Sequence, residues 1–362
     1  MSLELIETAK YLSAPGKGLL ASDESTGTIG KRLEKAGFEN TEEARRSYRE
    51  LFYTAPIGEA GISGAILFKE TLGQQAADGT LFVECLQRQG VLAGIKVDEG
   101  LVPLDGCPGE TSTRGLATLE AACRGYVAQG AKFAKWRAAL KVGGGCPTEQ
   151  CIETNAQQLA EYAAVCQACG LVPIVEPELL IDGNHDQAAF ADASTRVITR
   201  CIAHLQRKGV VLEATLIKPQ MIIPGADYTG PKADPSEVAQ HTLAVMRQCV
   251  PAAIPGIMFL SGGQTEEEAT INLNRINQEA QQSGGCPWSL SFSFGRSLQA
   301  SVLKLWSEDQ GEASKARCRE MAAALAHANS RAVLGKFEGL HPSITSQQGS
   351  LRETFRGWRT DV

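Results

Sequence analysis

Residues 214–220 read Ala-Thr-Leu-Ile-Lys-Pro-Gln, a short apolar run that ends in a lysine and a proline. Such a run is typical of a buried β-strand, where a lysine is out of place. Burying an ammonium group without a partner costs several kcal/mol, so a lowered pKa and a neutral amine are the cheaper outcome. A neutral, desolvated amine attacks carbonyl carbons. Lys218 is therefore a candidate nucleophile, unless it pairs with a carboxylate or reaches solvent at the strand end.

The pattern around Lys218 recurs along the chain as a short apolar run, a polar turn and a longer segment with helical periodicity. We expect strands at 18–22, 62–69, 92–97, 132–136, 172–175, 214–218, 257–260 and 290–294. We expect helices at 41–52, 112–129, 155–169, 186–208, 235–249, 265–283, 296–306 and 313–334. Alternating strands and helices imply a parallel sheet, and eight such units favour a closed (β/α)8 TIM barrel over an open doubly wound sheet.

The sequence predicts one domain. No low-complexity linker divides the chain, so residues 1–342 are expected to form the barrel with extra terminal helices. Residues 343–362 are polar and irregular, which predicts a flexible C-terminal tail.

Composition excludes several classes of protein. The 362 residues are 43% hydrophobic and 21% charged, with a net charge of −6 and no basic block that would suggest nucleic acid or a membrane surface. No apolar run approaches the roughly 20 residues that span a bilayer. The N-terminus resembles neither a signal peptide nor a transit peptide. We expect a cytoplasmic protein, or one of the chloroplast stroma if a transit peptide has been removed.

The eleven cysteines indicate reduced, mostly buried thiols, because they are scattered and accompany no export signal. Cys166 and Cys169 form a C-x-x-C pair, but inside an expected helix rather than at a helix start. No histidine spacing indicates a metal site. An exposed pair such as Cys146 and Cys151 would permit redox control.

Polar groups gather at the carboxyl ends of the expected strands, where β/α barrels carry their chemistry. Residues two apart in a strand share a face, so Lys135 and Arg137 point the same way, as do Glu176 and Glu178. The strand-end groups are Asp23-Glu24-Ser25, Lys96-Val97-Asp98, Lys135-Trp136-Arg137, Glu176-Pro177-Glu178, Lys218, Ser261-Gly262-Gly263 and Gly295-Arg296.

These residue types divide by chemical role. Lys135 can supply the neighbouring cation that activates Lys218, and Glu176 can move the protons that forming an imine requires. The hydroxyl and glycines of 261–263, with Arg296, are suited to a phosphate, which barrels commonly bind after strands seven and eight.

The chain resembles class I fructose-bisphosphate aldolases. The matching segments occur in family order between about residues 5 and 335. They are Leu20-Ala-Ser-Asp-Glu-Ser-Thr-Gly27, Gly94-Ile-Lys-Val-Asp98, Phe133-Ala-Lys-Trp-Arg137, Val172-Pro-Ile-Val-Glu-Pro-Glu178, Leu216-Ile-Lys-Pro219, Phe259-Leu-Ser-Gly-Gly-Gln264 and Ser293-Phe-Gly-Arg296.

The resemblance implies a TIM barrel, usually a homotetramer, that acts in glycolysis, gluconeogenesis or the Calvin cycle. It implies reversible cleavage of fructose 1,6-bisphosphate to dihydroxyacetone phosphate and glyceraldehyde 3-phosphate. It also implies no metal or other cofactor, since a lysine Schiff base takes up the electrons.

The resemblance assigns five catalytic residues. Lys218 resembles the imine-forming lysine, and Lys135 the lysine that assists carbinolamine formation. Glu176 resembles the general acid/base of dehydration, with Glu178 beside it. Asp23 resembles the residue that helps to deprotonate the C4 hydroxyl.

The resemblance also implies substrate-binding residues at both ends of the sugar. The residues that match one phosphate site are Ser261, Gly262, Gly263, Gly295 and Arg296. Those that match contacts to the far end of the substrate are Ser25, Lys96 and Arg137. Lys31 and Arg32 match a basic pair near the phosphates.

The chain departs from the family at its C-terminus. Many members end in a tyrosine that helps to protonate the enamine, whereas this chain ends Phe355-Arg-Gly-Trp-Arg-Thr-Asp-Val362. Enamine protonation is therefore expected to be slower, or to use another group or water.

Three other readings fit a reactive lysine in a barrel. They are a lysine-imine barrel for another phosphorylated ketose or a transaldolase, a pyridoxal phosphate enzyme, and a binding or scaffold protein without turnover.

Overall fold

The computed structural model describes residues 2–346, within which eight parallel strands close into a barrel. Around the barrel the strands follow the order β1-β10-β9-β8-β7-β6-β3-β2, so the predicted TIM barrel is confirmed. The strands are β1 (Gly18–Ser22), β2 (Ile62–Leu67), β3 (Leu92–Lys96), β6 (Phe133–Leu140), β7 (Val172–Leu179), β8 (Leu216–Ile217), β9 (Gly256–Phe259) and β10 (Ser289–Phe294).

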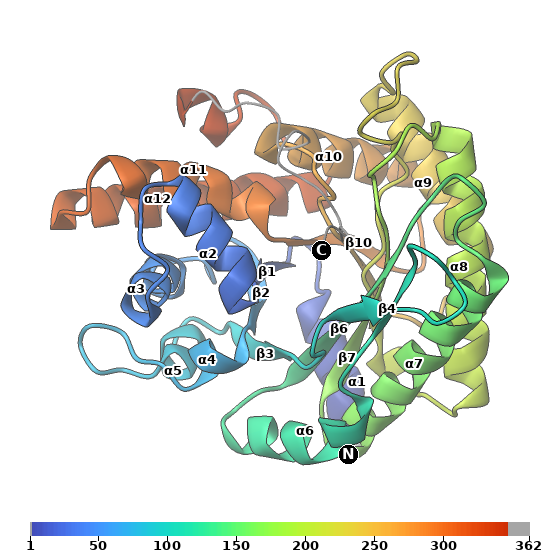
Figure 1. The fold of residues 1–362 in the computed structure, drawn as a ribbon. Coiled ribbons are helices and arrows are strands. Elements are labelled where there is room, and N and C mark those ends of the chain that lie inside the picture. The colour runs from blue at the N-terminus through green and yellow to red at the C-terminus, as the bar shows by residue number, and fades with distance from the viewer. Residues whose placement is uncertain (1, 347–362) are drawn as a thin grey trace.

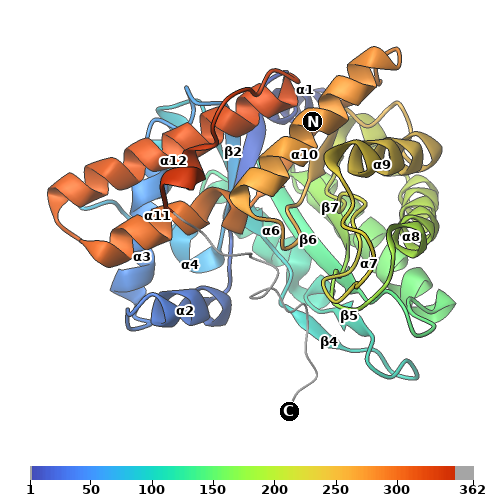
Figure 2. The same cartoon turned by 90° about the horizontal axis from the view of Figure 1, so that it is seen from above.

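Helices surround the barrel (Figure 1). Figure 2 shows α7, α8 and α9 along one side and α3, α11 and α12 along the other. The α-helices are α1 (Ser2–Leu12), α2 (Thr26–Lys35), α3 (Glu42–Tyr53), α4 (Lys69–Leu72), α5 (Phe82–Gln87), α6 (Leu119–Ala128), α7 (Glu149–Ala168), α8 (Gln187–Arg207), α9 (Pro235–Cys249), α10 (Glu266–Gln282), α11 (Arg296–Glu308) and α12 (Glu312–Val333).

Capping fixes where the long outer helices begin. Asp234 and Glu237 form a capping box at the start of α9, and Thr265 and Glu268 form one at the start of α10. Each pair satisfies backbone N–H groups that the first helical turn would leave without partners. None of the helices within residues 2–346 is long and apolar enough to cross a membrane.

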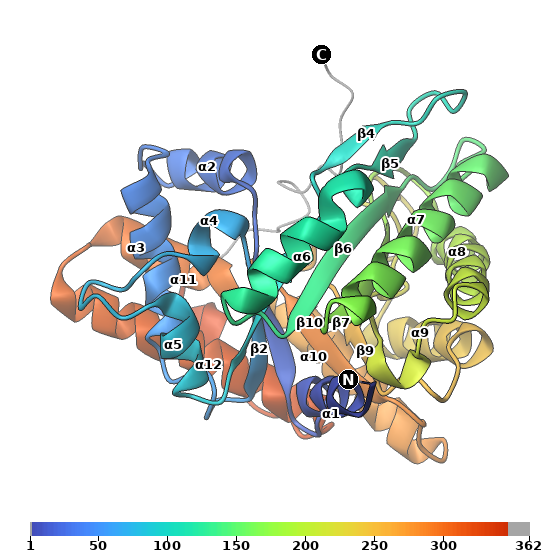
Figure 3. The ribbon, with the colours of Figure 1, turned by 90° about the horizontal axis from the view of Figure 1, so that it is seen from below.

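The inside of the barrel is apolar at the amino ends of the strands. Phe133, Leu216 and Met258 point into one cluster with side chains of α1, including Leu12. Helix α1 therefore closes this end of the barrel, near the start of β2 in the view from below (Figure 3). The predicted polar residues lie at the opposite end, where the strands have their carboxyl ends.

The helix predicted over residues 112–129 begins too early. Residues 112 and 113 belong instead to β5 (Thr111–Thr113), which pairs antiparallel with β4 (Leu101–Pro103). The hydroxyl of Thr111 donates to the carbonyl of Ala139 at 2.9 Å, and that of Thr113 to the carbonyl of Arg137 at 2.8 Å. These contacts dock the hairpin on β6, and α6 begins only at Leu119.

Strands β6 and β7 are longer than predicted and run to Leu140 and Leu179. Four α-helices were missed, namely α1, α2, α4 and α5. At the C-terminus, Pro342–Ser346 forms the short 3-10 helix η3. The rest of the predicted tail, residues 347–362, lies outside the described residues.

Glycine 94 in β3 makes room for an aromatic ring inside the barrel. A Cβ at this position would lie 2.2 Å from Cε2 of the fully buried Phe133. We expect Gly94→Ala to destabilise the fold by about 1–3 kcal/mol through overpacking, measured by urea unfolding. Gly125→Ala in α6 is the matched control, because its Cβ would meet nothing within 4 Å, and it should stabilise by up to about 1 kcal/mol. Equal effects of the two substitutions would contradict this account of the packing.

Candidate active site

Lys218 follows β8 directly and is buried, with 4% of its surface exposed. Its backbone N–H donates to the carbonyl of Val175 at 2.8 Å, which continues the pairing between β7 and β8 and fixes where the side chain starts. The Nζ atom lies 3.0 Å from Oε1 of Glu176. Lys218 is therefore not isolated. It pairs with a carboxylate, which was one of the alternatives that the sequence left open, and that carboxylate belongs to a predicted catalytic residue.

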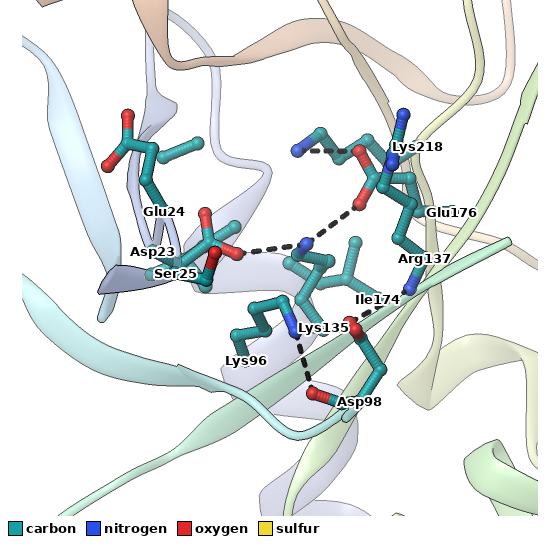
Figure 4. A network of polar contacts seen from close by, with 12 residues as sticks. Asp23, Glu24, Ser25, Lys96, Asp98, Lys135, Arg137, Ile174, Glu176 and Lys218 are labelled. Atoms are coloured by element: carbon teal, nitrogen blue, oxygen red, sulfur yellow. Dashed lines mark hydrogen bonds and ion pairs between the residues drawn. The ribbon is translucent and has the colours of Figure 1, made fainter. Parts of the chain in front are cut away.

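Four predicted catalytic residues form one chain of charges, which we call the central ion-pair network: Asp23, Lys135, Glu176 and Lys218 (Figure 4). Lys135 Nζ lies 2.9 Å from Asp23 Oδ2 and 3.2 Å from Glu176 Oε2. Negative and positive groups thus alternate, with Glu176 between the two lysines. All four side chains are buried.

The network determines how its members titrate. Burial alone would raise the pKa of the carboxyl groups of Asp23 and Glu176, but Lys135 and Lys218 outweigh it and hold both pKa values below the ordinary range. Burial alone would lower the pKa of Lys135, but Asp23 and Glu176 raise it above its ordinary value. Asp23 and Glu176 are therefore ionised, and Lys135 protonated, at neutral pH.

Two further ion pairs border the network. Lys96 Nζ lies 2.5 Å from Asp98 Oδ1, and Arg137 pairs through its Nε with Glu178. Lys96 and Lys135 are neighbours in the register of β3 and β6. The predicted residues of strands three to five therefore lie together at the carboxyl end of the barrel.

The residues predicted to bind one phosphate lie after β9 and β10. Gly262 and Gly263 have φ angles of 46° and 78°, in the left-handed region that glycine tolerates. At Gly262 a Cβ would also lie 1.7 Å from Nε2 of Gln220, so the loop requires glycine. Gly295 caps α11, whose amino end carries a partial positive charge suited to an anion.

Arg296, the first residue of α11, is close enough to two other arginines to be affected by their charges. Burial, together with the neighbouring guanidinium groups of Arg32 and Arg137, lowers the pKa of Arg296 to about 10. The three positive charges of Arg296, Arg32 and Arg137 repel one another in a partly desolvated site. Such a cluster attracts a doubly charged anion. The electrostatics therefore fit the predicted phosphate site.

Helix α2 brings the remaining predicted residues to the same end. Ser25 caps the helix by accepting the N–H of Thr28 at 3.3 Å, and it directly follows Glu24 and Asp23. Arg32 pairs with Glu24 at 2.6 Å. Lys31, in contrast, is exposed on α2.

Sequence reasoning gave no role to three residues that the structure places here. The carboxyl of Glu24 accepts a hydrogen bond from Gln299 Nε2 at 2.9 Å, and Gln299 also donates to the carbonyl of Ala21 at 2.7 Å. Asp98 holds Lys96. Glu24 and Asp98 stand at strand ends, which was the available signal; Gln299 lies inside α11 and carried none.

The hypothesis of an exposed Cys146–Cys151 redox pair is wrong in one respect. Cys151 is fully buried in α7, and burial raises the pKa of its thiol to about 12. A buried thiol with a raised pKa is a poor target for oxidants. The predicted change in enamine protonation concerns residues that lie outside those described.

Comparison with known proteins gives consistent results. The family described as fructose-bisphosphate aldolase class-I matches residues 4–355. "Fructose-bisphosphate aldolase 4, cytosolic" of Arabidopsis thaliana is 52% identical over 93% of this chain and 84% of that protein. "Fructose-bisphosphate aldolase, cytoplasmic isozyme 1" of Pisum sativum is 51% identical over 93% of this chain and 92% of that protein.

A solved structure has the same fold. The fructose-bisphosphate aldolase of Plasmodium falciparum, crystallised with TRAP and a small-molecule inhibitor, superposes with a TM-score of 0.89. It is 44% identical and covers 93% of this chain and 96% of that one. With the barrel, the buried lysines and the carboxylates between them, these matches place the chain in the class I fructose-bisphosphate aldolase family.

Proposed function

We propose that this chain cleaves fructose 1,6-bisphosphate reversibly to dihydroxyacetone phosphate and glyceraldehyde 3-phosphate through a Schiff base on Lys218. The observation that carries the proposal is the ion pair between the buried Lys218 and Glu176, with Lys135 on the other side of the same carboxylate. This arrangement supplies a nucleophile and a proton-transfer group within hydrogen-bond reach of each other.

The C–C bond between two hydroxylated carbons breaks only if its electrons have an acceptor. The amine of Lys218 adds to the C2 carbonyl, and loss of water gives a protonated imine. The electron pair of the C3–C4 bond moves toward this imine, which leaves an enamine and releases the aldehyde. Protonation at C3 and hydrolysis then release dihydroxyacetone phosphate and regenerate the amine.

The central ion-pair network supports specific roles in the proton transfers. Glu176 contacts both lysines, so it can accept a proton from one and return it to the departing hydroxyl of the carbinolamine. Lys135 stays cationic and stabilises negative charge that develops on the C2 oxygen. Asp23 is ionised and is suited to take the proton of the C4 hydroxyl.

The barrel order supports an orientation for the substrate. β9, which precedes Ser261, neighbours β8 and Lys218, so the loop after β9 suits the phosphate on C1, beside the imine carbon. β3 lies on the far side of β7 and β6, so Lys96, with Arg137 and Ser25, suits the phosphate on C6.

The wider setting also belongs to the proposal. Relatives named cytosolic or cytoplasmic support action in the cytoplasm, in glycolysis or gluconeogenesis. We also propose a homotetramer, which the family resemblance supports. We further propose that residues 1–342 form one domain.

Lys218→Met should abolish cleavage, because methionine removes the nucleophile and keeps the apolar stem. We expect kcat to fall by at least about 1,000-fold in a coupled assay for glyceraldehyde 3-phosphate. Wild-type activity should persist in excess chelator. Lys132→Met, at an exposed lysine just before β6, should keep full activity. A Lys218→Met enzyme that retains wild-type kcat would refute the Schiff-base mechanism.

Glu176→Gln should destabilise the fold, because it leaves two buried ammonium groups without their shared carboxylate. The expected loss at pH 7 is about 3–5 kcal/mol in urea unfolding. Because the folded-state pKa of Glu176 lies below its ordinary value of 4.5, this loss should stay constant down to about that pH and shrink only below it.

The control for this substitution is Glu120→Gln, which breaks an exposed pair with Arg124 and should cost less than about 1 kcal/mol. A difference between wild type and Glu176→Gln that already shrinks between pH 7 and 5 would show that the pKa of Glu176 is raised instead.

A further inference from the structure

Asp98 is a buried carboxylate at the site that the proposed chemistry does not use. It stands two residues beyond Lys96, the last residue of β3, and its side chain is 4% exposed. Lys96 is the register neighbour of Lys135. Asp98 therefore places a negative charge at the part of the rim assigned to the C6 phosphate.

Asp98 occupies most of the hydrogen-bonding capacity of Lys96. The ammonium group donates to Asp98 Oδ1 at 2.5 Å and to the carbonyl oxygen of Asp98 at 2.6 Å. A lysine has three N–H donors, so two are used by one residue and one remains for a ligand.

The carboxylate of Asp98 is itself fixed in place. Its Oδ1 accepts the N–H of Gly100 at 3.2 Å, and its Oδ2 accepts the N–H of Arg137 in β6 at 3.4 Å. Because both partners are backbone N–H groups, they cannot move with a ligand that binds at Lys96. When an anion approaches Lys96, the negative charge of Asp98 must therefore stay close to it.

Two other cations at this end of the barrel show the same pairing. Arg137 is held by Glu178 and Arg32 by Glu24. Each cation thus meets an arriving phosphate with a carboxylate already bound. A phosphate has to compete with that carboxylate and is repelled by it, which weakens phosphate binding.

We propose that Asp98 is a positioning residue that competes with the C6 phosphate of the substrate for Lys96. Asp98 holds Lys96 at the rim when the site is empty. When substrate is bound, Asp98 weakens the interaction of Lys96 with the C6 phosphate. Binding that stabilises substrate and transition state equally lowers KM without raising kcat, and it delays release of the phosphorylated aldehyde. The inference rests on the proposed function, since it takes Lys96 as a contact to the C6 phosphate.

Asp98→Asn tests the competition directly, because the amide keeps an oxygen for Lys96 and for Gly100 but loses the charge. KM for fructose 1,6-bisphosphate should fall by about threefold to tenfold, while kcat does not rise. KM for fructose 1-phosphate, which has no C6 phosphate, should change by less than about twofold. A residue with only a structural role would raise KM or lower kcat for both substrates.

Two controls separate a local effect from a general change of charge. Glu99→Gln removes the same charge one residue away, where the side chain is exposed, and should leave both KM values unchanged. In a Lys96→Met background, Asp98→Asn should no longer lower KM, because the competitor acts through Lys96. Asp98→Ser is the second variant should the asparagine impair folding, since its hydroxyl can still accept from Gly100.

The outcomes distinguish this inference from the proposed function. A wild-type chain that does not cleave fructose 1,6-bisphosphate would overturn both. Normal wild-type cleavage, with a KM that rises or stays unchanged in both Asp98 variants, would overturn only the competition. So would an equal fall in KM for both substrates, or a fall that persists without Lys96.

Discussion

The interaction on which the rest of the site depends is the buried contact of Glu176 with two lysines. Two carboxylates and two lysine side chains alternate from Asp23 to Lys218, so each carboxylate lies beside at least one lysine nitrogen. Each would be costly to bury alone, and together they are stable only while every member is present. The barrel meets this condition in two ways. Lys135, Glu176 and Lys218 stand on or directly after the neighbouring strands β6, β7 and β8, and Asp23, after β1, reaches Lys135 from a strand that pairs with none of these three.

This constraint also divides the molecule into two ends. The amino end of the barrel is filled with apolar side chains and covered by α1, so it supplies stability. The carboxyl end keeps the charges, and the cations outside the central network face the positions proposed for the two phosphates. Carboxylates already engage several of these cations, so on the proposed assignment substrate binding would be an exchange of ion pairs.

The barrel and most of the site could be predicted because their signals are local. Each strand is an apolar run ended by a polar residue, and a closed parallel barrel brings all such ends to one rim. Helix α1 and hairpin β4–β5 were missed because their structure depends on contacts between distant parts of the chain. Residues 111–113 fold as a strand because their hydroxyls find the carbonyls of β6, a contact that no local pattern reveals.

The pairing of Lys218 and the roles of Gln299 and Asp98 are also tertiary properties. The apolar run around Lys218 left open whether the amine is isolated, paired with a carboxylate or exposed at the strand end. Its partner, Glu176, comes from β7, the neighbouring strand of the barrel. Which carboxylate meets which cation depends on strand register, and one strand end offers several candidates. Residue types and spacing could therefore predict the set of reactive groups but not their partners.

The central claim is that Lys218 forms the covalent bond to substrate. It is tested most directly by reducing the wild-type protein with borohydride in the presence of dihydroxyacetone phosphate and mapping the adduct by peptide mass spectrometry. The account predicts one stable adduct, on Lys218, and no adduct when dihydroxyacetone phosphate is left out. An adduct on Lys135 or another lysine, or no adduct during active cleavage, would contradict it.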